Sequence, residues 1–187
     1  MPPDQELFVL WLLKTEREIG RYRLAEMLGV PQGIARGILL HMKRDGLIQA
    51  RSRAGTRASS EGLRKLTVLM KRHNLRLVKR SDQELLGLDS SSVLFHVAGR
   101  SRQLGQGIEQ RDAAIKAGAT GAITFLFDGT TLKFPGVAES LQRRDPAAFE
   151  KLKKQVTMKK GDVILIAFAS TWWDAARGGF AAVRTLG

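Results

Sequence analysis

The sequence predicts an α+β protein of two domains, a mainly helical N-terminal domain and a C-terminal domain in which strands and helices alternate. Apolar residues recur at helical spacing over most of residues 4–72, whereas short apolar runs separated by glycine-containing turns begin at residue 93. A polar stretch at residues 76–92 separates the two patterns, and 187 residues suffice for two buried cores. We therefore expect domains at residues 1–75 and 93–187, joined by a linker at 76–92.

The composition narrows the class of protein. Cysteine is absent and the three histidines are far apart in sequence, so disulfides and thiolate zinc sites are excluded and we expect neither a metal nor a cofactor. The longest apolar run, Leu7 to Leu13, is too short to span a bilayer, and Asp4 and Glu6 precede it where a signal peptide needs positive charge. A cytoplasmic protein with no membrane partner is expected.

The net charge of +13 is concentrated in one third of the chain. Residues 21–80 hold fifteen Lys or Arg against three acidic residues, so they carry +12, while the first twenty residues sum to −2 and the last 107 to +3. Such a surplus on a small folded unit is typical of a protein with a polyanionic partner, because binding releases counterions. A merely solvated basic surface is the alternative.

Three helices are predicted first, at residues 4–15, 21–28 and 31–45. Gly29 ends the second helix in a left-handed conformation, and Pro31 suits the first position of the third helix, which Gly46 ends. In the third helix Ile34, Ile38 and Met42 recur every four residues and predict its buried stripe. Two helices joined by a tight glycine turn are typical of a helix-turn-helix motif, whose second helix enters the major groove of DNA.

Side chains opposite this stripe are the candidates for reading DNA, because a two-residue offset is a rotation of about 200°. They are Gln32, Arg36, Leu40, Lys43 and Arg44. Gln and Arg read bases through paired hydrogen bonds, whereas Lys43 and Arg44 are suited to phosphates. Gly33 and Gly37 each cost a helix about 1 kcal/mol, which either close approach of DNA or packing against a neighbouring helix would explain.

A basic hairpin is predicted next, with strands at residues 47–50 and 56–58 and a glycine-containing turn at 51–55. Arg51, Arg53 and Arg57 lie at or beside its tip and suit phosphates or a minor groove, and a solvated loop is the alternative. A fourth helix begins at Ser59 or Ser60 and runs to about Arg72.

The segments Tyr22–Val30 and His41–Ile48 resemble the winged-helix domains of prokaryotic transcription factors, and the resemblance covers about residues 5–72. It implies a winged helix-turn-helix fold and double-stranded DNA as the partner. Some winged helices bind only protein or are attached to enzymes, so the fold by itself leaves these alternatives open.

The C-terminal half predicts the order βαββαβ followed by a helix. The expected strands are residues 93–98, 122–127, 131–134 and 163–169, and the expected helices are 108–117, 146–155 and one that begins at the capping box of Thr171 and Asp174. This order indicates a ferredoxin-like domain, an antiparallel sheet with helices on one face, with an extra C-terminal helix. By analogy with regulators that contain such a domain, it would dimerise and sense a small molecule.

Taken whole, the chain resembles an archaeal family of winged-helix proteins with an uncharacterised C-terminal domain. The resemblance is carried by Ile108–Ile115, Gly118–Ala122 and Phe134–Gly136. The resemblance implies a winged helix followed by the family's C-terminal domain, and it implies no activity and no ligand.

A glycine-rich basic loop, Gly99–Gly107, precedes the first helix of this domain. Backbone amides at a helix N-terminus hold phosphates and carboxylates, but the spacing matches neither the Walker loop nor the dinucleotide fingerprint, so a plain flexible loop is the alternative. The adjacent Arg111 and Asp112 either orient a ligand or form a surface ion pair. The candidate residues for a small anionic effector are Arg100, Arg102, Gly105, Gly107, Arg111 and Asp112.

Together these observations predict a homodimeric, sequence-specific DNA-binding transcriptional regulator that is not an enzyme. The recognition helix at about residues 31–45 would lie in the major groove and the wing at about 47–58 on the backbone. Two other classes remain as alternatives. One is an enzyme with an appended winged helix, such as a riboflavin-kinase-like phosphotransferase, and the other is a non-specific nucleic-acid-binding protein.

Overall fold

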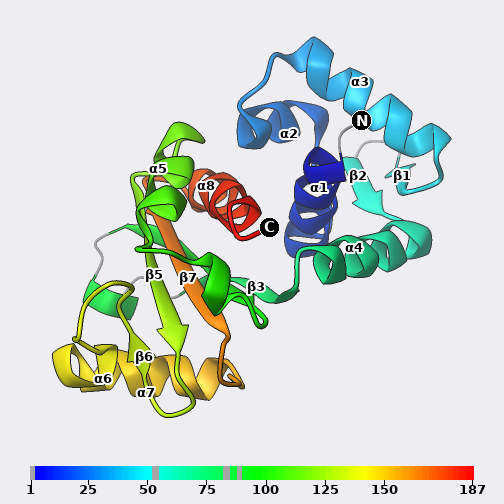
Figure 1. Cartoon of the computed structure of the whole chain (residues 1–187). Coiled ribbons are helices and arrows are strands. Elements are labelled where there is room, and N and C mark those ends of the chain that lie inside the picture. Colours follow the sequence, from blue (N-terminus) through cyan, green and yellow to red (C-terminus); the bar gives the residue numbers. More distant parts are fainter. Residues whose placement is uncertain (1–2, 52–54, 82–84, 88–89) are drawn as a thin grey trace. The chain divides into compact units, whose positions relative to one another are not determined.

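A computed structural model describes residues 3–51, 55–81, 85–87 and 90–187 (Figure 1). The chain divides into two compact units, an N-terminal unit at Met1–Arg72 and a C-terminal unit at His73–Gly187. None of the helices in the described residues is long and apolar enough to span a membrane.

The N-terminal unit contains the predicted elements in the predicted order. They are α1 (Pro3–Glu16), α2 (Arg21–Leu28), α3 (Gln32–Arg44), the antiparallel hairpin of β1 (Ile48–Arg51) and β2 (Gly55–Ala58), and α4 (Ser60–Arg72). Gly29 ends α2 with φ 64°, and its N–H donates to carbonyls of the last turn, as the sequence predicted. The unit therefore has a helix-turn-helix followed by a wing.

One contact of this unit has no signal in the sequence. Ile19, between α1 and α2, forms a bridge with Thr56 of β2, and each backbone N–H donates to the other residue's carbonyl at 2.9 Å. Gly55 lies directly over Ile19, where a Cβ would come within 2.9 Å of the Ile19 carbonyl. The wing is thus joined to the chain between the first two helices by backbone hydrogen bonds.

The C-terminal unit is built on a five-stranded antiparallel sheet. Its elements are β3 (Leu75–Ser81), the 3-10 turn η1 (Leu85–Gly87), β4 (Ser91–Val97), η2 (Ser101–Gln103), α5 (Ile108–Lys116), β5 (Gly121–Phe127), β6 (Leu132–Lys133), α6 (Leu141–Arg144), α7 (Pro146–Gln155), β7 (Val163–Ala169) and α8 (Trp172–Arg184). The strand order is β3-β4-β7-β5-β6. The α+β class and the expected order of elements are confirmed, with β3 and the short α6 added.

The linker expected at residues 76–92 is wrong in its first part. Residues 75–81 form β3, which pairs with β4 from Leu75 opposite Val97 to Ser81 opposite Ser92. Only Leu75 and Val78 of this edge strand are buried, and Arg76, Lys79 and Arg80 gave the segment its polar, linker-like composition.

Helices cover both faces of the sheet, whereas the sequence predicted one. α5 and α8 pack on one face, where Phe180 of α8 lies edge-on to Phe95 at 5.1 Å between ring centroids. α7 lies on the other face (Figure 1). Its residues Phe149 and Leu152 pack in a cluster with Leu94 and Ile164. This is why β7, the central strand, is apolar along its whole length and carries no polar, solvent-facing side.

Two glycines let α8 lie close to its neighbours. A Cβ on Gly179 would overlap the ring of Phe95, and one on Gly178 would overlap Ala119 and approach the Ala114 carbonyl. Close packing of α8 on the sheet and on α5 therefore requires residues without side chains at both positions.

Candidate nucleic-acid interface

The helix α3 presents one face to its own unit and one to solvent. Ala35, Ile38 and Met42 are buried, with the i, i+3, i+7 spacing of a packed helix face. Ile34, predicted in the buried stripe, is 54% exposed. The prediction for Ile34 is wrong because Ala35, three residues before Ile38 and seven before Met42, lies on the buried face instead.

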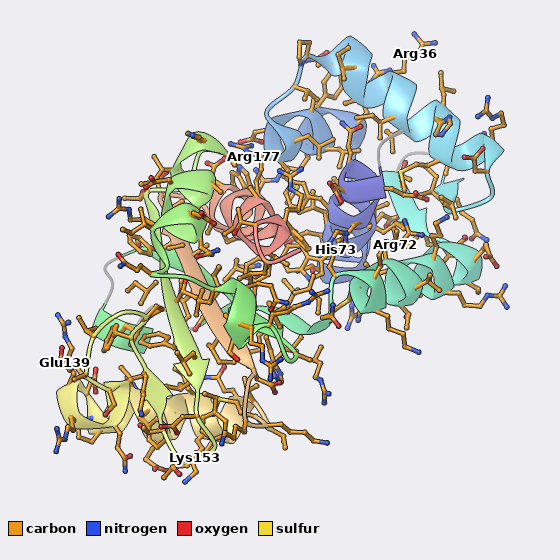
Figure 2. The ribbon with its side chains drawn as sticks, viewed as in Figure 1. Arg36, Arg72, His73, Glu139, Lys153 and Arg177 are labelled. Carbon is orange, nitrogen blue, oxygen red and sulfur yellow. The ribbon has the colours of Figure 1, made fainter. Side chains whose placement is uncertain are left out.

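The exposed face of α3 carries the predicted DNA-reading residues. Gln32, Arg36, Leu40 and Lys43 are all exposed, and Figure 2 shows Arg36 projecting away from the rest of its unit. Among the described residues no carboxylate pairs with Arg36 or Lys43. Their charges are therefore available to an external anion.

Gly33 and Gly37 leave the backbone bare on this face. A Cβ added at either position would have nothing within 4 Å of it among the described residues. Packing against a helix of the described chain therefore does not explain these glycines. Close approach of DNA, the other explanation that the sequence left open, stays a prediction.

The C-terminal end of α3 is held by exposed polar contacts. Nη2 of Arg44 lies 2.9 Å from Nδ1 of His41, and Nε donates to Oδ1 of Asp45 at 3.2 Å. Arg44 is thus partly engaged within the chain, unlike Arg36. Such solvent-exposed pairs are worth about 0–1 kcal/mol, so a phosphate can replace them at little cost.

Only part of the predicted basic wing lies within the described residues. Arg57 faces Gln49 across the hairpin and donates from Nη2 and Nε to Oε1 of Gln49 at 3.0 and 3.3 Å. Arg51 is the last residue of β1, and its backbone lies opposite Gly55. Arg53 lies outside the described residues.

The charge of the N-terminal unit supports a polyanionic partner. Its 72 residues contain fourteen Lys or Arg and seven Asp or Glu, a surplus of seven. The acidic residues on its surface pair locally, as in Arg23–Glu26 at 3.0 Å and Arg64–Glu61 at 2.7 Å. α3 itself contains no acidic residue.

The six candidate effector residues do not form one site. Gly107 and Arg111 line a pocket of about 480 Å³ beside β5, and Arg111 donates from Nε and Nη2 to Oδ1 of Asp112 at 3.1 and 2.9 Å. Arg102 lines a different hollow, with Asp128 and Lys160. Neither pocket includes Arg100 or Gly105.

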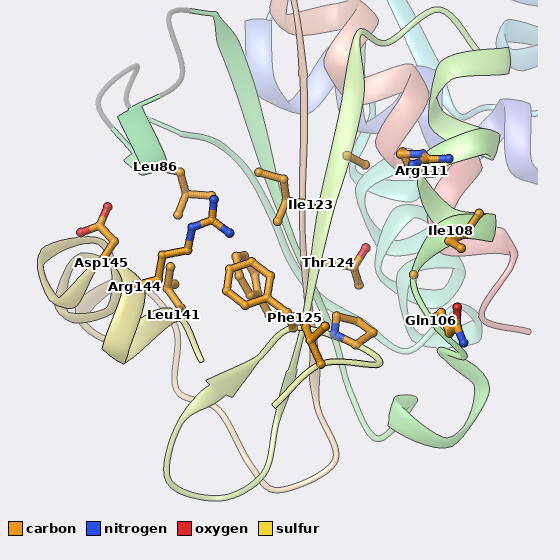
Figure 3. A pocket seen from close by; sticks show the side chains of 15 residues that line it. Leu86, Gln106, Ile108, Arg111, Ile123, Thr124, Phe125, Leu141, Arg144 and Asp145 are labelled. Carbon is orange, nitrogen blue, oxygen red and sulfur yellow. The ribbon is translucent and has the colours of Figure 1, made fainter. Parts of the chain in front are cut away.

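Several residues of the pocket beside β5 were not predicted. Thr124, Phe134, Leu141 and Arg144 line it together with the predicted Gly107 and Arg111 (Figure 3). Thr124 lies in β5, Phe134 directly follows β6, and Leu141 and Arg144 lie on α6, so no short motif joins the four. Within the described residues there is no group of three His, Asp or Glu side chains that could hold a metal ion.

Comparison with known proteins gives one family and one related fold. The sequence model of the family described as "Domain of unknown function (DUF4443)" matches residues 88–186. The solved structure of "Hypothetical protein PH0730 from Pyrococcus horikoshii OT3" superposes with a TM-score of 0.73 at 23% identity, covering 100% of this chain and 92% of that one. At this identity the likeness concerns the fold alone. A search of curated proteins found no match.

Proposed function

The chain belongs to the family described as Domain of unknown function (DUF4443), and from this premise we propose that it is a sequence-specific DNA-binding transcriptional regulator. The observation that carries the proposal is the exposed face of α3. It combines an unpaired arginine and lysine with Gln32 and two glycines that meet no part of the described chain. These are the groups with which a recognition helix reads base edges and approaches the backbone of the major groove.

The wing and the charge of the N-terminal unit support the same partner. Arg57 lies on β2 beside the wing tip, and phosphate contacts from such a hairpin would fix the register of α3 in the groove. The resemblance of residues 5–72 to winged-helix domains of prokaryotic transcription factors points the same way.

The proposed regulator acts as a homodimer. A single recognition helix contacts only a few base pairs, so a second copy bound about 34 Å along the duplex would supply the selectivity that a regulator needs. The operator would then be approximately palindromic. Sedimentation of the protein with and without a selected DNA fragment measures this stoichiometry.

The phosphotransferase alternative predicts a closed C-terminal barrel. The sheet of the C-terminal unit is open, with β3 and β6 at its two edges, and gives that alternative no support.

The decisive experiment selects fragments of the source genome with the full-length protein, at several salt concentrations and with excess unrelated duplex. The expected result is a small set of fragments that share a near-palindromic sequence and survive competition. Equal retention of unrelated duplexes would overturn sequence specificity in favour of a general nucleic-acid-binding protein. Absence of any binding at low salt would overturn the proposal altogether.

A further inference from the structure

The pocket beside β5 lies where the sheet lacks a strand (Figure 3). β6 pairs with β5 only at Leu126 and Phe127, so residues 122–125 of β5 have no partner on that side among the described strands. The first turn of α5 flanks this open edge on one side and α6 on the other. The resulting volume, about 480 Å³, is within the range of sites that bury small molecules.

A buried hydroxyl in the wall of the pocket is left without a partner. Thr124 is 5% exposed and lines the pocket, yet its Oγ1 atom makes no hydrogen bond. Oγ1 itself is covered, so a rotation of the Thr124 side chain about χ1 is needed to present the hydroxyl to the pocket. An unsatisfied buried hydroxyl costs about 1–3 kcal/mol, and an acceptor supplied by a ligand after that rotation would recover the energy.

The N-terminus of α5 lies directly beside this hydroxyl. Gly107 is the N-cap, with φ 79°, and no side chain caps the helix. The first backbone N–H groups of α5, the positive end of a nine-residue helix, therefore have no side-chain acceptor among the described residues. A Cβ built on Gly107 would lie 3.9 Å from Cβ of Thr124, so the open amides and the free hydroxyl share one corner of the pocket.

The charged groups of the lining favour an anion. Arg111 and Arg144 are basic and Asp145 is acidic, but Oδ1 of Asp145 already accepts from the Ala148 N–H at 2.9 Å. Arg111 pairs with Asp112 and Arg144 lies 3.8 Å from Glu139, but the two arginine side chains are 54% and 65% exposed. Exposed ion pairs of this kind are worth about 0–1 kcal/mol, so either arginine can turn toward a ligand at little cost. An anion at this corner would meet donors from Thr124, the helix amides and Arg111.

The remaining wall is apolar. Ile123, Phe125, Phe134, Pro135 and Leu141 line it, and the rings of Phe125 and Phe134 lie 4.9 Å apart at an angle of 59°. A ligand of this pocket therefore needs an apolar body as well as a negative group.

We propose that this pocket binds a small organic acid with an aromatic or branched apolar body and one carboxylate. The carboxylate accepts hydrogen bonds from Thr124 and the first turn of α5 and pairs with Arg111, while the apolar body packs against Phe125 and Phe134. The site lies within the C-terminal unit and its test uses no DNA, so it stands independently of the proposed function.

The test is a titration of the full-length protein with 4-fluorobenzoate, followed by ¹⁹F NMR. A ligand of this size in a formed pocket binds with a Kd of about 10 mM or below. The uncharged 4-fluorobenzamide, which has the same shape, should bind about tenfold more weakly, because it loses the charge-assisted hydrogen bonds. Equal affinity for the two compounds, or binding of neither at about 10 mM, overturns the proposal.

Variants locate the binding site. Thr124→Val preserves the volume and removes the hydroxyl, and it should weaken 4-fluorobenzoate about fivefold, while Thr124→Ser should bind like the original protein. Arg111→Met should weaken binding about tenfold. Lys116→Met removes the same charge from the exposed far end of α5 and is the matched control, expected to bind unchanged. If Lys116→Met and Arg111→Met weaken binding equally, or if Thr124→Val has no effect, the acid does not bind at this corner.

Discussion

Nε2 of His96 lies 2.7 Å from Oδ2 of Asp162, and both side chains are 3% exposed. The same carboxylate accepts the Gly99 N–H at 3.0 Å and the Lys159 N–H at 2.9 Å. His96 belongs to β4 and Asp162 directly precedes β7, so one carboxylate joins two neighbouring strands and the turns beside them. No local sequence pattern indicates this pair, because its members are 66 positions apart in the chain.

Asp162→Asn should lower the free energy of unfolding by about 3 kcal/mol, because it breaks a buried pair whose other partner stays buried. Urea unfolding measures the change. Asp112→Asn, which alters an exposed ion pair on α5, is the control and should change stability by less than about 1 kcal/mol. Equal effects of the two substitutions would show that the buried pair contributes no special stability.

The pH dependence of stability should also report on Asp162. Burial acts to raise the pKa of Asp162, but hydrogen bonds from Lys159, His96 and Gly99 outweigh it and hold the pKa below its ordinary value. A carboxyl group with a depressed pKa in the folded state stabilises the protein above its unfolded pKa, about 4, and loses that contribution as pH falls through the folded pKa. Below about pH 4 the original protein should therefore lose stability more steeply than Asp162→Asn. Parallel curves in acid urea titrations would contradict the assignment.

Arg36→Ala should weaken binding to a selected operator by about 1–3 kcal/mol and reduce the preference over unrelated duplex. Arg64→Ala on α4 removes the same charge from an exposed site that is paired with Glu61, and serves as the control. Fluorescence anisotropy with both duplexes measures the ratio of affinities. An unchanged ratio for Arg36→Ala would show that Arg36 does not read bases.

Lys43→Ala should weaken binding to all duplexes alike, because an exposed lysine near the end of α3 suits a phosphate. The slope of log affinity against log salt should fall by about 1. A salt slope equal to that of the original protein would remove Lys43 from the interface.

Gly37→Ala should have opposite effects on stability and binding. The added Cβ meets open space in a helix, so the free energy of unfolding should rise by about 1 kcal/mol. The same methyl group would hinder close approach of DNA to α3, so affinity should fall. Higher stability with unchanged affinity would mean that this face does not approach the duplex.

The N-terminal unit could be predicted in detail because its signals are local. Gly29, Pro31, Gly46 and the basic hairpin each determine the conformation of their own segment. The prediction that Ile34 is buried was wrong for two reasons. Residues spaced four apart rotate gradually around a helix of 3.6 residues per turn, and the small side chain of Ala35 gave no strong apolar signal although it is buried.

The C-terminal unit was predicted only as a list of elements. Its strand order depends on β7 lying between β4 and β5, a pairing of distant segments that no local pattern specifies. The continuous apolar run of β7 was an available sign that helices cover both faces. The pocket escaped prediction because Gly107, Thr124 and Arg144 come together only through that strand order.

The edge strand β3 has a consequence for the protein at high concentration. A strand with one unpaired side is a template onto which another chain can add, and continued addition leads to aggregates. Arg76 and Lys79 are exposed along β3, so a second copy aligned on this edge would bring like charges together. The same basic residues that made the segment resemble a linker thus disfavour edge-to-edge addition of a second copy at β3.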